Sequence, residues 1–192
     1  MNAEQELHAT LETVARAFDE LQVPWAIGGS FASTVYGEPR ATNDIDVVAV
    51  LRAADVTDFI RKLGEHFYAD EASIRSAVAS RASFNIIDER SFLKVDVFVP
   101  PPGPMGEGQL TRRRQYPIPP NGLPVFVLGP EDTALQKIRW FRLGGETSDR
   151  QWRDILGVVR LTQLDIAYMR ELAVEGELVH LLDRALVESG RS

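Results

Sequence analysis

The sequence predicts an α+β fold in which a mixed sheet is flanked by helices and followed by a C-terminal helical section. Three observations predict this class. First, over residues 1–129 short apolar segments with strand character alternate with segments of helical periodicity. Second, only helical patterns follow over residues 130–192. Third, 44% of the 192 residues are hydrophobic, as in an ordinary globular protein. We therefore expect a core over residues 1–129 and a helical section over residues 130–192.

The spacing of apolar residues predicts the elements in order. Helices are expected at residues 4–21, 31–36 and 53–63, where apolar side chains recur every three or four positions, and Ser30 is expected to cap the second of them. Apolar runs predict strands at residues 25–27, 45–51, 83–87, 92–99 and 123–128. The segment 100–122 holds seven prolines and four glycines, so we expect an irregular loop there. From Pro130 onward the pattern predicts helices, broken at Gly144-Gly145, near Thr162 and at Gly176.

Composition and charge narrow the classes of function. The net charge of −7 argues against broad non-specific binding of nucleic acid, although a local basic patch such as Arg112–Arg114 leaves a nucleic-acid substrate open. The chain has no cysteine, which excludes disulfides, thiolate metal sites and cysteine nucleophiles. No signal peptide is evident and no apolar run is long enough to span a membrane, so we expect a cytoplasmic protein.

Gly28-Gly29-Ser30, followed at short range by Asp44-Ile45-Asp46, is the most informative pattern in the chain. A Gly-Gly turn lets the backbone approach a phosphate closely, because neither glycine carries a Cβ, and its amides can bind an anion at the start of a helix. Asp44 and Asp46 lie one residue apart on an expected strand, so both carboxylates point to the same face. Hard cations such as Mg²⁺ prefer oxygen ligands. The pattern therefore predicts a phosphate cradle beside a metal-binding pair of carboxylates.

A third acid, Asp96, lies in the apolar strand expected at residues 92–99. Strand alternation places Asp96 on the face opposite the three valines of this strand, and an acid among such residues is costly to bury unless it is paired or bound to metal. Two interpretations stay open. Asp96 is either a third metal ligand that accepts a proton from an attacking hydroxyl, or an acid that faces solvent on an edge strand or pairs with Lys94 or Arg90.

Gly28-Gly29-Ser30, Asp44-x-Asp46 and Asp96 together resemble the DNA polymerase β-like nucleotidyltransferase superfamily, whose pattern is a Gly-Gly or Gly-Ser turn, a nearby Asp-x-Asp and a later strand acid. The segment 27–50, with its Arg40-x-Thr42-x-Asp44 stretch, is similar to AbiEii-type and related uncharacterised bacterial nucleotidyltransferases, some of which are toxins of toxin–antitoxin pairs. The C-terminal signature of that group resembles the segment from Glu131-Asp132 through Lys137 to Arg150, Trp152 and Asp154.

The resemblance implies a nucleotidyltransferase-like sheet and a role for each matching residue. Gly28, Gly29 and Ser30 would hold the β- and γ-phosphates of a nucleoside triphosphate (NTP). Asp44 and Asp46 would bind two Mg²⁺ ions, for which Mn²⁺ is a possible substitute, and Asp96 would bind one of them. The implied reaction joins a nucleoside monophosphate (NMP) to a hydroxyl group and releases pyrophosphate.

Three further residues are candidate nucleotide contacts, and each has a plainer alternative. Arg40 either touches phosphate or is a loop charge, and Thr42 either hydrogen-bonds an aspartate or positions the strand. Lys137 lies within the first helix of the C-terminal section, where it either reaches the triphosphate as a point charge or extends harmlessly to water. Arg150 and Asp154 are interpreted as a structural i,i+4 pair.

The acceptor of the NMP is not specified by a fold or by an active site. RNA, a protein hydroxyl and a small molecule such as an aminoglycoside stay open, and the resemblance favours a toxin with an antitoxin partner. The alternative is a catalytically silent nucleotide-binding or regulatory module of the same fold. The complete set of three acids argues against that alternative, because the loss of one metal ligand would disable the chemistry.

Overall fold

The computed structural model describes residues 3–38, 44–118, 123–161 and 163–191. Its helices are α1 (Ala3–Glu20), α2 (Gly29–Tyr36), α3 (Val56–Leu63), α4 (Glu71–Ser80), α5 (Pro130–Leu143), α6 (Asp149–Leu161), α7 (Ile166–Glu175) and α8 (Val179–Glu188). Two short 3-10 helices are η1 (Ala53–Asp55) and η2 (Glu107–Arg112). The strands are β1 (Trp25–Ile27), β2 (Asp44–Ala49), β3 (Phe67–Tyr68), β4 (Ser83–Asp88), β5 (Leu93–Phe98), β6 (Arg114–Ile118) and β7 (Leu123–Val127).

These strands form one mixed sheet in the order β3-β4-β5-β2-β1-β7-β6. At its centre β2 and β5 pair in parallel, although 43 residues separate the end of one (Ala49) from the start of the other (Leu93). β1 pairs antiparallel with β2 and parallel with β7, while the β4–β5 and β6–β7 pairs are antiparallel. The mixed sheet flanked by helices confirms the predicted fold class.

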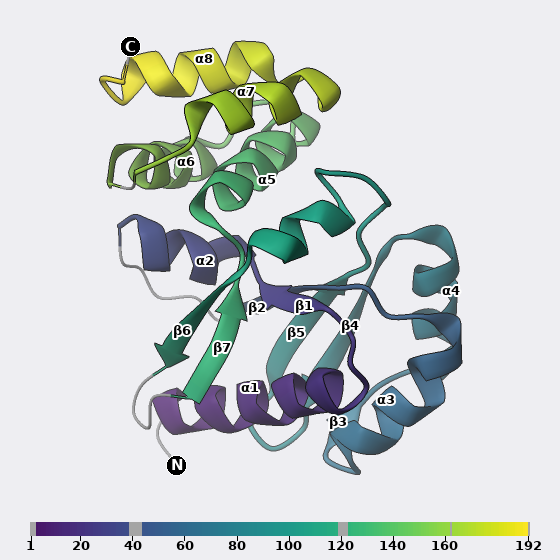
Figure 1. Ribbon diagram of the computed structural model, residues 1–192. Helices are drawn as coiled ribbons and strands as arrows, with labels where there is room; N and C mark the ends of the chain where they lie inside the picture. The colour runs from purple at the N-terminus through teal and green to yellow at the C-terminus, as the bar shows by residue number, and fades with distance from the viewer. Residues whose placement is uncertain (1–2, 39–43, 119–122, 162, 192) are drawn as a thin grey trace.

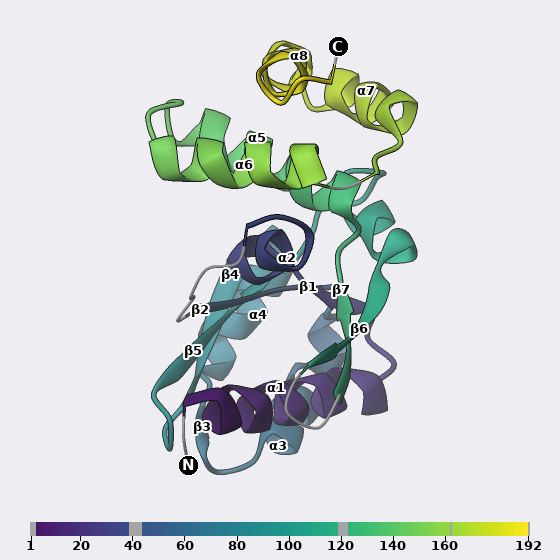
Figure 2. The ribbon, with the colours of Figure 1, turned by 90° about the vertical axis from the view of Figure 1, so that its left-hand side faces the viewer.

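Helices cover both faces of the sheet (Figures 1 and 2). α1, α3 and α4 lie on one face, where the rings of Phe18 and Phe59 stack at 4.7 Å and Phe59 meets Phe84 of β4 at 6.3 Å. α2 lies on the other face, and α5 to α8 are layered beyond it (Figure 2). Across the residues that the structure describes, no helix is both long and apolar enough to cross a membrane.

Two local predictions about loops and caps are wrong. Ser30 does not cap α2, because the helix already begins at Gly29, with Gly28 as an N-cap residue that makes no side-chain bond. The segment 100–122 is not irregular throughout, since it contains η2 and β6. β6 is an edge strand that pairs only with β7, and an edge strand tolerates a residue such as Pro117 that has no N–H to donate.

The arginines at positions 112 and 113 hold the segment 100–122 against the rest of the protein. Arg112 donates from Nε and Nη2 to the buried carboxylate of Asp132 on α5, at 3.0 and 2.8 Å, and Tyr168 of α7 donates its hydroxyl to the same carboxylate at 3.0 Å. The Arg113 guanidinium lies 4.2 Å over the ring of Phe126. Arg112 and Arg113 are therefore engaged in contacts within the protein, and the basic patch suggested for a nucleic-acid substrate stays a prediction.

Candidate active site

The predicted acids lie on one face of the two central strands. In the parallel β2–β5 pair, Asp46 is the direct partner of Asp96, and Asp44 is the partner of Lys94. Neighbouring strands are about 4.8 Å apart, and alternate residues share a face. The opposite face of β2, which carries Ile45, is buried in the apolar core. The structure therefore brings the three sequence-predicted carboxylates onto one side of the sheet.

The Gly28-Gly29 turn is built against the carboxylate of Asp46. Gly29 has a φ of +53°, and a Cβ placed on it would lie 1.8 Å from Asp46 Oδ2. The Gly28 N–H donates to the backbone carbonyl of Asp46 at 2.8 Å, and the Ser30 N–H donates to the Asp46 carboxylate. A glycine at position 29 is thus required by the acid itself, whether or not a phosphate also approaches the turn.

The charge of Asp46 is destabilised by its surroundings. Burial raises the pKa of the Asp46 carboxyl above its ordinary value, and the negative charges of Asp96 and Asp44 raise it further. The Ser30 amide and the Lys137 ammonium act in the opposite direction. A cation bound beside Asp46 would relieve this repulsion.

Asp96 is paired with a lysine, as one of the two sequence interpretations expected. Lys94 Nζ lies 2.8 Å from Asp96 Oδ2, whereas Arg90 pairs with Asp88. The edge-strand alternative is wrong, because β5 lies between β4 and β2. Asp96 is also only partly exposed, with 23% of its side chain accessible.

The donor set of this face fits Mg²⁺, because three carboxylates offer the oxygen ligands that hard cations prefer and their mutual repulsion favours a bound cation. The ligands are not yet gathered, however. Within the described ranges, no three acidic or histidine side chains are grouped as a ready metal site. The ion pair between Lys94 and Asp96 directs an Asp96 oxygen toward the ammonium. The metal-ligand roles of Asp44, Asp46 and Asp96 stay predictions.

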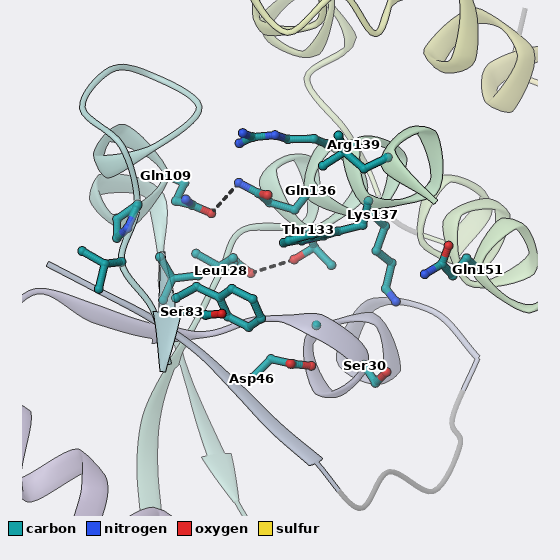
Figure 3. Close-up of a pocket in the computed structure, with 18 of the residues that line it drawn as sticks. Ser30, Asp46, Ser83, Gln109, Leu128, Thr133, Gln136, Lys137, Arg139 and Gln151 are labelled. Carbon is teal, nitrogen blue, oxygen red and sulfur yellow. Dashed lines mark hydrogen bonds between the residues drawn. The ribbon is translucent and has the colours of Figure 1, made fainter. Parts of the chain in front are cut away.

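A cleft of about 650 Å³ lies between this face of the sheet and α5. At one end it is lined by Gly28, Gly29, Ser30 and Asp46. Lys137 enters the same end, extending from α5 toward Ser30 at the start of α2 (Figure 3). Asp96 adjoins this site as the strand partner of Asp46, and Asp44 lies two residues before Asp46 on β2. Neither is among the residues that line the cleft. The cleft thus joins the glycine turn, one acid and one lysine in a single concave site.

Lys137 is held by a carboxylate on the next helix. Its Nζ donates to Asp154 Oδ2 of α6 at 3.0 Å, and only 12% and 14% of the two side chains are exposed. Lys137 therefore does not extend freely to water, and its charge acts on Asp46. The i,i+4 pair of Asp154 with Arg150 stays a prediction, whereas the structure shows that Asp154 lines the cleft and accepts a hydrogen bond from Lys137.

The cleft is also lined by aromatic residues that the sequence did not single out. Phe98 of β5 and Trp140 of α5 meet there with their rings 5.8 Å apart, and Arg139 and Ser83 line the same cavity. Trp140 is 50% exposed, which is high for a tryptophan. Phe98 follows Asp96 on the same face of β5, and this alternation is the one signal that the sequence contained.

Two predicted nucleotide contacts, Arg40 and Thr42, lie outside the described residues. The other seven predicted site residues are described and lie on or next to the cleft. They are Gly28, Gly29, Ser30, Asp44, Asp46, Asp96 and Lys137.

Three solved structures share this fold. A nucleotidyltransferase-like protein from Paracoccidioides brasiliensis is 19% identical with a TM-score of 0.53, over 96% of this chain and 92% of that one. The antibiotic-resistance factor ANT(2'')-Ia is 13% identical with a TM-score of 0.52, over 96% of this chain and 93% of that one. The lincosamide antibiotic adenylyltransferase LnuA, solved with lincomycin bound, is 15% identical with a TM-score of 0.50, over 80% of this chain and 97% of that one. No family model matches the sequence, and no curated protein does. At these identities the likeness concerns the fold, and the chain has the fold of nucleotidyltransferases.

Proposed function

We propose that this protein is a Mg²⁺-dependent nucleotidyltransferase that moves an NMP from an NTP to a hydroxyl acceptor. One observation carries the proposal: a single cleft contains the glycine turn at the start of α2, the Asp46 carboxylate beside Asp96, and the Lys137 ammonium. A triphosphate needs a cationic and amide-lined cradle, and the reacting phosphorus needs carboxylates close by. The nucleotidyltransferase fold supports the same reaction.

In this proposal, different residues of the cleft bind different parts of the NTP and the metal. Lys137, oriented by Asp154, attracts the β- and γ-phosphates from the α5 side. The turn at Gly28, Gly29 and Ser30 offers the close backbone approach on the opposite side. Asp44, Asp46 and Asp96 would hold Mg²⁺, which when bound supplies charge stabilisation at the reacting phosphate and the leaving pyrophosphate.

The transfer itself is a displacement at the α-phosphorus. The acceptor oxygen forms a bond to this phosphorus, the bond from the phosphorus to the bridging oxygen of the β-phosphate breaks, and pyrophosphate leaves with that bonding pair. Asp96 accepts the proton of the acceptor hydroxyl, because it is the strand partner of Asp46 and its side chain is partly exposed. The same position lets Asp96 serve as both ligand and base.

For the biological role, our first candidate is a cytoplasmic toxin of the AbiEii type with an antitoxin partner. The sequence resemblance over residues 27–50 and 131–154 supports this candidate. A small-molecule acceptor is the second candidate, and a specific observation favours it. The cleft has an aromatic wall of Phe98, two residues after Asp96 on β5, and Trp140 of α5, which suits a compact ring system.

The test is transfer of label from each α-³²P-labelled NTP, offered separately with Mg²⁺, to total RNA, to lysate protein or to a small-molecule extract. Wild type is compared with the Asp44→Ala/Asp46→Ala double variant and with Asp58→Ala, which removes an exposed acid of α3 that does not line the cleft. We expect label in one acceptor class with wild type and Asp58→Ala, and none with the double variant. NTP binding without transfer to any fraction would favour the silent module instead, and absence of NTP binding would overturn the proposal.

A further inference from the structure

The ammonium group of Lys94 lies among the carboxylates that the proposed metal site requires. Lys94 is the register partner of Asp44 across the β2–β5 pair, and it lies two residues before Asp96 on the same face of β5. Its Nζ is 2.8 Å from Asp96 Oδ2, and the charges of Asp44 and Asp46 also act on it. One lysine therefore faces all three acids.

This pair differs from the other lysine ion pairs of the chain. The sequence has three lysines, and each forms an ion pair with a carboxylate. Lys62 pairs with Glu20 between α3 and α1, outside the cleft, and Lys137 pairs with Asp154 in a nearly buried contact. Lys94 is the lysine whose partner is itself a proposed metal ligand. Its side chain is 43% exposed, so it can leave Asp96 for water without opening the core.

We propose that Lys94 is a positioning residue that serves as the counter-cation of the acid face, holding Asp96 until a metal ion enters and then releasing it. The inference rests on the proposed metal role of the three acids. Because the ammonium and a divalent cation compete for the same carboxylate, the site without nucleotide binds metal weakly. Nucleotide phosphates supply further oxygen ligands, so the metal enters together with the NTP.

The electrostatic reason lies in the fixed register of the strands. Asp46 and Asp96 cannot move apart, because each is held on a central strand and they are direct partners. An ammonium beside them offsets their repulsion as long as no metal is bound. A divalent ion that arrives must displace this ammonium or tolerate a positive charge beside it, and either requirement lowers the affinity for metal.

The first test measures Mn²⁺ binding without nucleotide, from the electron paramagnetic resonance signal of free Mn²⁺. We expect Lys94→Met to bind Mn²⁺ about tenfold more tightly than wild type. Lys94→Arg keeps the charge and should retain weak binding. Lys62→Met removes an ion-paired lysine outside the cleft and should also behave as wild type. An unchanged Mn²⁺ dissociation constant in Lys94→Met would overturn the proposal.

The second test uses wild-type protein and does not depend on how a variant folds. With ¹³C at the lysine ε-carbons the protein gives three side-chain signals, which the lysine variants assign. Addition of Mg²⁺ and α,β-methylene ATP should shift the Lys94 signal and leave the Lys62 signal in place. A response at Lys137 with none at Lys94 would contradict release of Asp96. If neither Lys94 nor Lys137 responds, the proposed nucleotide site fails, and the Mn²⁺ titration, which needs no nucleotide, still decides the role of Lys94.

Discussion

Replacing Gly29 by alanine should lower the stability of the protein and displace the Asp46 carboxylate, whereas replacing its neighbour Gly28 should do neither to the same extent. A Cβ on Gly29 would lie 1.8 Å from Oδ2, 2.4 Å from Cγ and 2.7 Å from Cβ of Asp46. Rotation of the Asp46 side chain can move the first two atoms but not the third, which is fixed to the backbone. To reach an ordinary contact of 3.4 Å, α2 and β2 must therefore separate by about 0.7 Å (from 2.7 to 3.4 Å).

Two costs add in this variant. The φ of +53° is unfavourable for a residue with a Cβ by about 1–2 kcal/mol. Forcing apart two packed elements costs about 1–3 kcal/mol more. We expect Gly29→Ala to lower the free energy of unfolding by about 2–5 kcal/mol, the sum of these two costs, and to displace the Asp46 carboxylate from its position at the start of α2.

Two control variants separate these costs. Gly28 has a φ of −122°, and its Cβ would meet Leu128 Cδ1 at 3.2 Å, the end of a flexible side chain, so Gly28→Ala should be mild. Gly145 has a φ of +75° with nothing within 4 Å of an added Cβ, so Gly145→Ala carries the backbone cost alone. Urea denaturation and Mn²⁺ titration of the three variants give the comparison. A Gly29→Ala protein that is no less stable than Gly145→Ala and binds Mn²⁺ normally would refute the reasoning.

Three further substitutions test the charges. The pKa of Asp46 is raised in the folded state, so the stability of the protein falls as pH rises through this folded-state pKa and the carboxyl becomes charged. Asp46→Asn should therefore abolish transfer but raise the Tm at pH 7, which thermal melts from pH 4 to 8 measure. Lys137→Met should weaken NTP binding about tenfold in equilibrium titrations, while Lys62→Met leaves it unchanged. Burial acts to raise the pKa of Asp88, but hydrogen bonds from Arg90 and Thr10 outweigh it and hold the pKa below its ordinary value. The stability that these bonds provide is present above the unfolded-state pKa of about 3.9 and is lost as pH falls through the lower folded-state pKa. Asp88→Asn should therefore lower the free energy of unfolding at pH 7 by about 1–3 kcal/mol. Urea titrations at several pH values should also show that the unfolding free energy of this variant depends less on acid pH than that of wild type.

The central strands could be predicted from local sequence because their burial leaves an apolar pattern. The predicted ends of β1, β2 and β5 agree with the structure to within two residues. α4 was not predicted, because this short segment has few apolar residues to mark its inner face, namely Ile74, Ala77 and Val78. Its start is fixed by Asp70, whose carboxylate accepts the Ser73 N–H at 2.7 Å. β6 was not predicted either, because an edge strand that contains proline forms only where β7 already offers a partner.

In the candidate site too, features set by local sequence could be predicted and features set by long-range contacts could not. Alternation along a strand predicted that Asp44 and Asp46 share a face, and the structure adds the parallel pairing that brings Asp96 beside them. Trp140 could not be predicted as part of the cleft. Its place depends on α5 folding back over β5, where it meets Phe98, and no local pattern contains that information.

The division of the chain at residue 129 stays a prediction, but the cleft shows what the helical section contributes. The glycine turn and the acids precede this position, whereas Lys137, Trp140 and Asp154 follow it. Buried apolar residues from both sections belong to one contiguous cluster. Asp46 is partly withdrawn from water and the Lys137 ammonium of α5 acts on it, so their attraction is stronger than it would be on an open sheet. A change that loosens the contact between α5 and α6 should therefore weaken nucleotide binding before it affects the sheet, because the charge of Lys137 is positioned by Asp154 of α6.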